Sequence, residues 1–146
     1  MKIIGTDLIG YLKAVKKLHK GNPIGKAYYK WILENGKFFS GQDQDREFTK
    51  CFKKRANGCY YNAQMLSLDN KKLKYFEGWG ISAGVGFPLE HGFNVADGKV
   101  FDISWSDTTE YFGVEIPKDF IRKEMLRTEM AGTILFQWFK KCTGRK

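Results

Sequence analysis

The sequence predicts an α+β fold in which an antiparallel sheet packs against helices, with residues 1–146 forming a single domain. Three observations predict it. Apolar residues recur at helical spacing near both ends of the chain, a β-hairpin is indicated in the second half, and a helix that starts near a cysteine lies between them. With 146 residues, the chain is long enough to bury one core.

Two amphipathic helices are predicted at the start of the chain. Thr6 or Asp7 can cap the first helix, which we expect to run to about Lys20. Pro23 suits the first position of the second helix, which we expect to end at Asn35 and the glycine after it. Lysines lie on the opposite side from the apolar residues in the first helix, so both helices are expected to pack on a core through one face.

A third helix is predicted to start at Asn57, whose side chain is a good N-cap. This helix carries Cys59 in its first turn, where the positive end of the helix dipole favours thiolate over thiol. Residues 37–55 lack a helical pattern and are expected to form a loop that can reach the helix N-terminus. A strand is expected from Leu73 to Ile81 after the helix.

The clearest structural prediction is a hairpin of residues 89–105 around Asp97-Gly98, a dipeptide favoured in two-residue type I′ turns. This turn sets Phe93 opposite Asp102. His91 then lies on the same face as Asp102 and diagonal to it, about 7–8 Å away between backbones. The hairpin therefore predicts a His–Asp pair on one side of the sheet.

One long helix is predicted at the end of the chain. It begins after Pro117, at Lys118, and runs to about Lys141. Gly132 falls inside this range and is a place where the helix could bend.

A nucleophilic site is predicted if the cysteine helix packs on the face of the sheet that carries the pair. Cys59 would attack a carbonyl carbon, His91 would protonate the leaving amine, and Asp102 would orient the imidazole. The backbone N–H of Cys59, at a helix start, is a natural oxyanion donor. The candidates for a second donor are Gln42, Gln44 and Asn57.

The segment from about Asn57 to Gly113 resembles the catalytic core of the transglutaminase-like branch of the papain-like thiol enzymes. The resemblance rests on the order Cys, His, Asp in the segments Gly58-Cys59, Glu90-His91-Gly92-Phe93 and Gly98-Lys99-Val100-Phe101-Asp102-Ile103-Ser104-Trp105. It implies a papain-like fold, with the helix of the catalytic cysteine packed on an antiparallel sheet and with flanking helices. It also implies nucleophile, base and orienter roles for Cys59, His91 and Asp102.

The chain also departs from this family. Papain-type enzymes have a glutamine six residues before the cysteine, where this chain has Lys53, so their usual oxyanion donor is missing. Phe93 stands where a tryptophan is more typical. Arylamine N-acetyltransferases share the Cys, His, Asp order, which leaves acyl transfer open. The chain is short for an acetyltransferase or a cross-linking enzyme, and a small hydrolase fits better.

The expected function is a cysteine-dependent hydrolase of the amidase or peptidase type, acting through an acyl-enzyme. Its substrate would be an amide, isopeptide or related acyl bond in a protein, a peptide or a small molecule. Trp79 and Trp105 are candidates for the substrate cleft, although such residues more often belong to the core. The formal net charge of +9 could steer an acidic substrate towards the protein.

The alternative is a basic binding protein that uses the same fold without catalysis and binds nucleic acid or a partner protein. It is supported by the +9 charge together with 16% aromatic residues, although no nucleic-acid-binding motif is present. A small acyltransferase is the other alternative.

Cysteine usage and hydropathy set the expected compartment. Cys51, Cys59 and Cys142 lack paired metal-ligand spacing, which indicates a reducing, cytoplasmic setting without a disulfide. We expect no cofactor and no metal, because a zinc site of Cys59, His91 and Asp102 would take one ligand from each element. No window approaches the length of a membrane span, so no membrane partner is expected. The sequence leaves the oligomeric state open.

Overall fold

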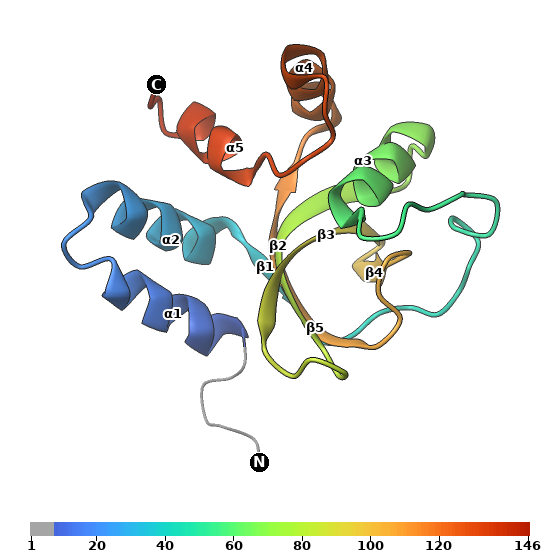
Figure 1. Ribbon diagram of the computed structural model, residues 1–146, viewed down its shortest axis with the longest axis horizontal. Helices are drawn as coiled ribbons and strands as arrows, with labels where there is room; N and C mark the ends of the chain where they lie inside the picture. Colours follow the sequence, from blue (N-terminus) through green and yellow to red (C-terminus); the bar gives the residue numbers. More distant parts are fainter. Residues whose placement is uncertain (1–7) are drawn as a thin grey trace.

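The computed structural model describes residues 8–146 as an α+β fold, with one sheet and helices packed on it (Figure 1). The elements within this range are α1 (Leu8–Leu18), α2 (Pro23–Asn35), β1 (Lys37–Phe39), α3 (Cys59–Asp69), β2 (Lys74–Ser82), β3 (Pro88–Ala96), β4 (Lys99–Phe101), β5 (Thr108–Ile116), α4 (Lys118–Thr128) and α5 (Leu135–Cys142).

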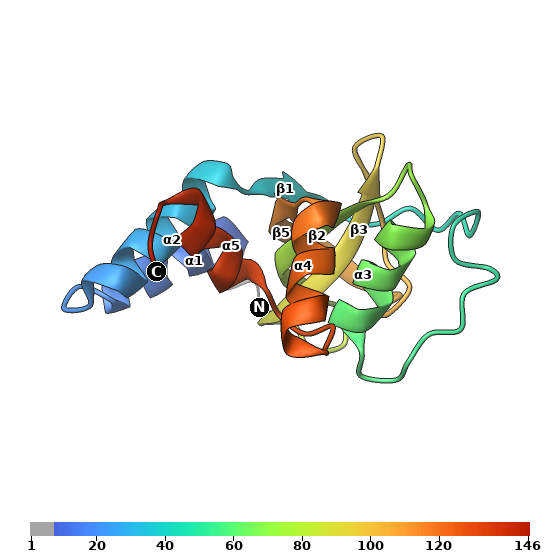
Figure 2. The same ribbon diagram turned by 90° about the horizontal axis from the view of Figure 1, so that it is seen from above.

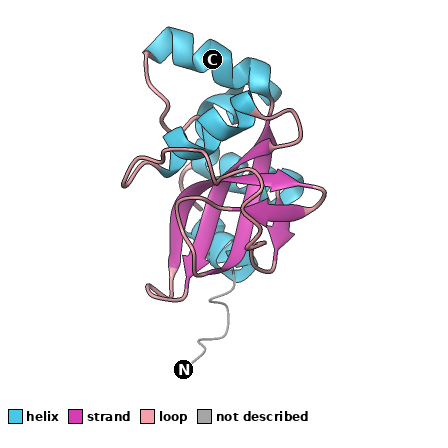
Figure 3. Ribbon diagram, turned by 90° about the vertical axis from the view of Figure 1, so that its right-hand side faces the viewer, coloured by secondary structure: helices cyan, strands magenta, loops and turns pink. Residues whose placement is uncertain are grey.

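The sheet is antiparallel and curled, with the strand order β1-β5-β2-β3-β4 (Figure 1). Seen from above, α1, α2 and α5 gather at one end of the sheet and α3 and α4 at the other (Figure 2). Loops cross the strands on the side that faces the viewer in Figure 3.

The two faces of the sheet bury different clusters, because successive side chains of a strand point to opposite sides. Tyr75 and Trp79 of β2 belong to the main core, which contains residues of all the helices packed on the sheet. We call this the helix-covered face. Phe76 of β2 and Phe93 of β3 form a smaller cluster with Tyr111 of β5 on the opposite, concave face.

The first two helices agree largely with the sequence prediction. α2 begins at Pro23, and the side chain of Asn22 caps it by accepting a hydrogen bond from the backbone N–H of Gly25 at 3.1 Å. α1 ends at Leu18, slightly earlier than predicted. The predicted capping residues Thr6 and Asp7 lie outside the described residues.

The hairpin register is confirmed. Asn94 pairs with Phe101, and Ala96 pairs with Lys99 beside the turn. Asp97 and Gly98 have φ angles of 51° and 75°, the left-handed geometry that a type I′ turn requires at both positions. The second strand is shorter than predicted, because β4 ends at Phe101.

Two strands were missed in the sequence. β1 lies within the predicted loop of residues 37–55, and β5 lies between β1 and β2 in the sheet. The sequence signal for β5 was a run rich in β-branched and aromatic residues, Thr108–Ile116, ending at Pro117.

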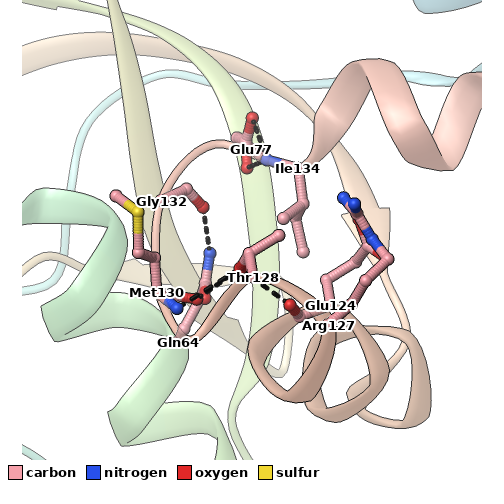
Figure 4. Close-up of polar contacts among 8 residues, drawn as sticks. All are labelled: Gln64, Glu77, Glu124, Arg127, Thr128, Met130, Gly132 and Ile134. Atoms are coloured by element: carbon pink, nitrogen blue, oxygen red, sulfur yellow. Dashed lines mark hydrogen bonds and ion pairs between the residues drawn. The ribbon is translucent and has the colours of Figure 1, made fainter.

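The prediction of one long final helix is wrong. α4 ends at Thr128, and Glu129 follows with a left-handed φ of 58°. The chain turns through Gly132 before α5 begins at Leu135. Glu77 of the sheet stabilises this break, because its buried carboxylate accepts a hydrogen bond from the backbone N–H of Ile134 at 2.9 Å (Figure 4). It also accepts one from the backbone N–H of Leu135 at 3.0 Å.

Hydropathy gives one further result. Within residues 8–146, no helix combines the length and the apolar character that crossing a bilayer requires.

Candidate active site

Cys59 is the first residue of α3. The predicted N-cap is wrong: Gly58 occupies that position, no side chain of the described chain caps the helix, and Asn57 precedes it with a left-handed φ of 57°. The first backbone hydrogen bond of the helix runs from the N–H of Asn62 to the carbonyl of Gly58, at 2.8 Å. The N–H of Cys59 therefore has no partner within its own helix, and the positive end of the helix dipole faces the thiol.

His91 and Asp102 form a buried pair. The Nε2 atom of His91 lies 2.7 Å from the Oδ2 atom of Asp102, and the two side chains are 0% and 1% exposed. The same Oδ2 accepts a hydrogen bond from the Tyr111 hydroxyl at 2.7 Å. Oδ1 accepts from the backbone N–H groups of Ser104, at 2.9 Å, and Trp105, at 3.1 Å. Four donors thus fix the carboxylate that orients the imidazole.

The hydrogen bonds of Asp102 also explain why β4 is short. The backbone N–H groups of Ser104 and Trp105 turn back to the Asp102 side chain, as in an Asx turn, and cannot continue the strand ladder. This turn places the Trp105 indole over the imidazole of His91, with ring centroids 3.5 Å apart and planes 8° from parallel. One face of the imidazole is therefore closed to solvent.

The remaining nitrogen of His91 is directed to Cys59. Nδ1 is buried and makes no well-formed hydrogen bond among the described residues. Since Nε2 is bound to Asp102, Nδ1 is the nitrogen that can exchange a proton with the thiol. Burial tends to lower the pKa of His91, but Asp102 and then the Cys59 thiol outweigh it and raise the pKa to about 9.

The electrostatics of Cys59 complement those of His91. Burial raises the pKa of the Cys59 thiol. The interaction with His91 and the backbone N–H groups of Gly92 and Tyr60 lowers this pKa by more, so the net shift is downwards. A lowered thiol pKa beside a raised imidazole pKa favours a thiolate–imidazolium pair near neutral pH.

The site is assembled across the edge of the sheet. α3 packs on the helix-covered face, where the Asn94 side chain donates a hydrogen bond to the carbonyl of Ala63 at 2.8 Å. His91 lies in register with residues of the concave face, so the helix and the pair do not share one face, the condition under which the sequence predicted the site. The pairing of β4 stops at Asn94, which leaves the edge of β3 free at His91 and Gly92. The N-terminus of α3 reaches His91 past this free edge.

Asn62 holds the helix start in this position, a role that the sequence did not reveal. It is fully buried, three residues after Cys59. Its amide group donates to the carbonyl of Arg55 at 3.0 Å and to the hydroxyl of Ser104 at 2.9 Å. Its oxygen accepts from the N–H of Arg55 at 2.8 Å. The available signal was a polar amide on an otherwise small and apolar helix face.

The predicted oxyanion donors fall into two different pockets. Asn57 lines a pocket of about 430 Å³ together with Cys59 and Trp105. Gln42 and Gln44 instead line a pocket that contains Asp102 but not Cys59. Of the three candidates, only Asn57 therefore shares a pocket with the thiol.

The predicted cleft residues Trp79 and Trp105 meet in a second hollow beside the site. This hollow has a volume of about 530 Å³ and also contains Tyr60, the residue that follows Cys59. Trp79 is 3% exposed and serves mainly as core. Trp105 lines both this hollow and the pocket of Cys59, so it separates the two cavities beside Cys59 and His91.

No metal-binding arrangement was found in the described part of the chain: residues 8–146 contain no group of three or more His, Cys, Asp or Glu side chains placed to hold an ion. Comparisons with protein-family models, curated proteins and solved structures found no match for this chain. The family resemblance therefore stays a prediction from the order of Cys59, His91 and Asp102 in the sequence.

Proposed function

We propose that this protein is a cysteine-dependent hydrolase of the papain-like, transglutaminase-like kind, acting on an amide or related acyl bond. The observation that carries the proposal is the buried imidazole of His91. One nitrogen is fixed by a carboxylate with four donors, and the other is left for the thiol at a helix start. A histidine that only packs in the core would not be expected to lie beside a thiol whose pKa is lowered.

The first half of the reaction forms an acyl-enzyme. The Cys59 thiolate attacks the carbonyl carbon, the C–N bond breaks, and His91 gives its proton to the leaving amine. The product of this step is a thioester on Cys59, and Asp102 keeps the imidazole in the orientation that the proton transfer needs.

The second half releases the acid. The neutral His91 takes a proton from water while the water oxygen attacks the thioester carbonyl, and the C–S bond then breaks. The thiolate–imidazolium pair is restored. The oxyanion of both steps would be stabilised by the N–H of Cys59, with the Asn57 side chain as the second donor.

The test is the rate of alkylation of each cysteine by iodoacetamide at pH 6, read by peptide mass. Cys51 and Cys142 are internal controls, since both are more exposed than Cys59. We expect Cys59 to react at least tenfold faster than either control in the wild type and to lose this advantage in His91→Ala.

Hydrolysis is tested separately with an activated ester, followed by intact mass. An acyl adduct should form on the wild type and decay, and it should be absent in Cys59→Ala. Equal alkylation rates for the three cysteines would overturn the proposal. A stable adduct that decays only when an amine is added would identify an acyltransferase instead.

A further inference from the structure

We propose that the hollow beside Cys59 lined by Tyr11, Tyr29, Tyr60, Trp79, Trp105 and Glu90 is a subsite for a cationic group of the substrate, such as a lysine or arginine side chain. The inference rests on the proposed function, because it names the group that would lie next to the bond attacked by Cys59. It goes beyond that function by assigning the chemistry that selects the substrate.

The hollow is joined to the candidate active site by two residues. Tyr60 follows Cys59 in α3, and Trp105 stacks on His91. A ligand in the hollow would therefore contact the residue that follows the nucleophile and the ring that stacks on His91. The volume, about 530 Å³, is sufficient for a long side chain.

Aromatic rings provide most of the lining. Three tyrosines and two tryptophans contribute, and they come from α1, α2, α3, β2 and the turn after β4. Tyr29 and Trp79 lie with their ring centroids 6.0 Å apart. Ring faces carry partial negative charge and attract cations, most strongly when the cation is partly desolvated.

Glu90 adds a full negative charge to this aromatic lining. It pairs with Trp79 across β2 and β3, so the two side chains lie on the same face of the sheet. The residues described form no ion pair with Glu90. Burial is the main reason that the pKa values of Tyr29 and Tyr60 are raised, and the Glu90 carboxylate contributes to both shifts. This carboxylate is thus close to the rings and available to a cation.

The pocket on the other side of Trp105 has the opposite charge. Lys54 and Arg55 line it together with Cys59, and it contains no acidic side chain. A cation is therefore favoured on the Glu90 side of the nucleophile and disfavoured on the other. This asymmetry would orient a substrate across the site, with its cationic group on the Glu90 side, although the net charge of the whole chain is +9.

The experiment measures binding and turnover independently. The probes for binding are Nα-acetyl-lysinamide and the neutral Nα-acetyl-norleucinamide, titrated into Cys59→Ala and followed by the indole N–H signals of Trp79 and Trp105. We expect the lysine probe to bind about tenfold more tightly than the norleucine probe. In Cys59→Ala/Glu90→Gln this preference should fall to near unity.

Glu115→Gln is the control. It removes the same charge from an exposed strand residue outside the hollow and should leave the preference unchanged in the Cys59→Ala background. Equal binding of the two probes, no binding of the lysine probe, or equal effects of the Glu90 and Glu115 substitutions would each overturn the subsite.

Turnover then separates the two proposals. Wild-type protein should hydrolyse a lysine aryl ester with a higher kcat/KM than the norleucine ester, and Glu90→Gln should remove the difference. If Cys59→Ala shows the lysine preference while the wild type hydrolyses neither ester, the subsite stands and the hydrolase proposal fails.

Discussion

At the scale of single residues, the reactivity proposed for the site depends on two opposed pKa shifts. The thiol of Cys59 has a lowered pKa, and His91 has a pKa raised from an ordinary value of 6.5 to about 9. His91 therefore keeps its proton through neutral pH, in a place where burial alone would remove it. In the proposed reaction, the protonated imidazole would both stabilise the thiolate and supply the proton for the leaving amine.

This pair predicts different pH profiles for two reactions of Cys59. Hydrolysis of an amide needs both the thiolate and the imidazolium, so kcat/KM should fall above about pH 9 as His91 loses its proton. Alkylation needs only the thiolate and should not fall there. Both rates are measured on the same preparation from pH 5 to 10. A decline of hydrolysis centred near pH 6.5 would contradict the raised pKa of His91.

A second prediction at this scale concerns Tyr111, whose hydroxyl is one of the four donors to Asp102. Tyr111→Phe should lower the free energy of unfolding by about 1.5–3 kcal/mol, the range for a hydrogen bond to a charged group. The measurement is urea denaturation. Tyr28→Phe, which removes a hydroxyl that does not bond to Asp102, is the control. An equal loss of unfolding free energy in both variants would show that the bond from Tyr111 to Asp102 adds no stability of its own.

At the scale of elements, Asn62 joins α3 to the two segments that frame the site. Its three hydrogen bonds fix the helix start relative to Arg55 and Ser104. Asn62→Ala should reduce the alkylation advantage of Cys59 at pH 6 by about tenfold or more, because all three bonds that position the helix are lost.

Asn70 offers a matched control on the same helix. Its side chain donates one bond, to the carbonyl of Leu66, at the end of α3 far from Cys59. Asn70→Ala should lower stability slightly and leave the reactivity of Cys59 unchanged. If the two variants change reactivity to the same extent, Asn62 has no specific positioning role.

The sequence revealed elements whose determinants are local. The hairpin was predictable because Asp97-Gly98 dictates the turn, and the turn dictates which residues face each other. The His91–Asp102 pair followed from that register. α2 was predictable from Pro23 and the glycine after Asn35.

The sequence did not reveal features that depend on distant contacts. The break between α4 and α5 depends on Glu77, which bonds to Ile134, 57 residues further along. The face on which α3 packs was likewise undetermined, since the register of a hairpin does not say where a helix will dock. Trp105 was assigned to the cleft, but its stacking on His91 required the turn at Asp102.

At the scale of the whole molecule, Glu77 of β2 connects the sheet to α3 and α5. It is 2% exposed and accepts hydrogen bonds from Tyr75, from the Thr133 hydroxyl and from the first N–H groups of α5. Tyr75 in turn accepts from Gln64 of α3, whose amide also donates to the carbonyl of Gly132 at 2.8 Å (Figure 4). One carboxylate thus fixes β2, α3 and α5 together.

Replacing Glu77 by glutamine should therefore destabilise the whole fold. The amide keeps the shape but turns an N–H₂ group towards backbone donors, and we expect a loss of about 2–4 kcal/mol of unfolding free energy. Denaturant unfolding measures the loss, and hydrogen exchange should show faster opening at Ile134 and Leu135. The exposed Glu115→Gln is the control. A loss of less than about 0.5 kcal/mol of unfolding free energy would show that the hydrogen bonds of Glu77 are dispensable for stability.

The net charge of the molecule allows a test of the non-catalytic alternative. A chain with a formal charge of +9 should bind generic DNA or RNA weakly at low salt, and the affinity should fall steeply as salt is added. We expect a mobility shift that disappears at about 150 mM salt and is the same in Cys59→Ala. Tight binding that persists at that salt concentration would instead favour a nucleic-acid-binding protein.

The assembly of the site across a sheet edge has a consequence for the life of the chain before it is folded. Cys59 comes from a helix on one face, and the His91–Asp102 pair belongs to the other. No single hairpin or helix contains the parts that make the thiol reactive. If the proposed active site is correct, a nascent or misfolded chain carries only an ordinary thiol, and the pKa of Cys59 is lowered only once α3 lies against His91. On the proposed mechanism, the chain would therefore be protected from its own chemistry until these parts have assembled.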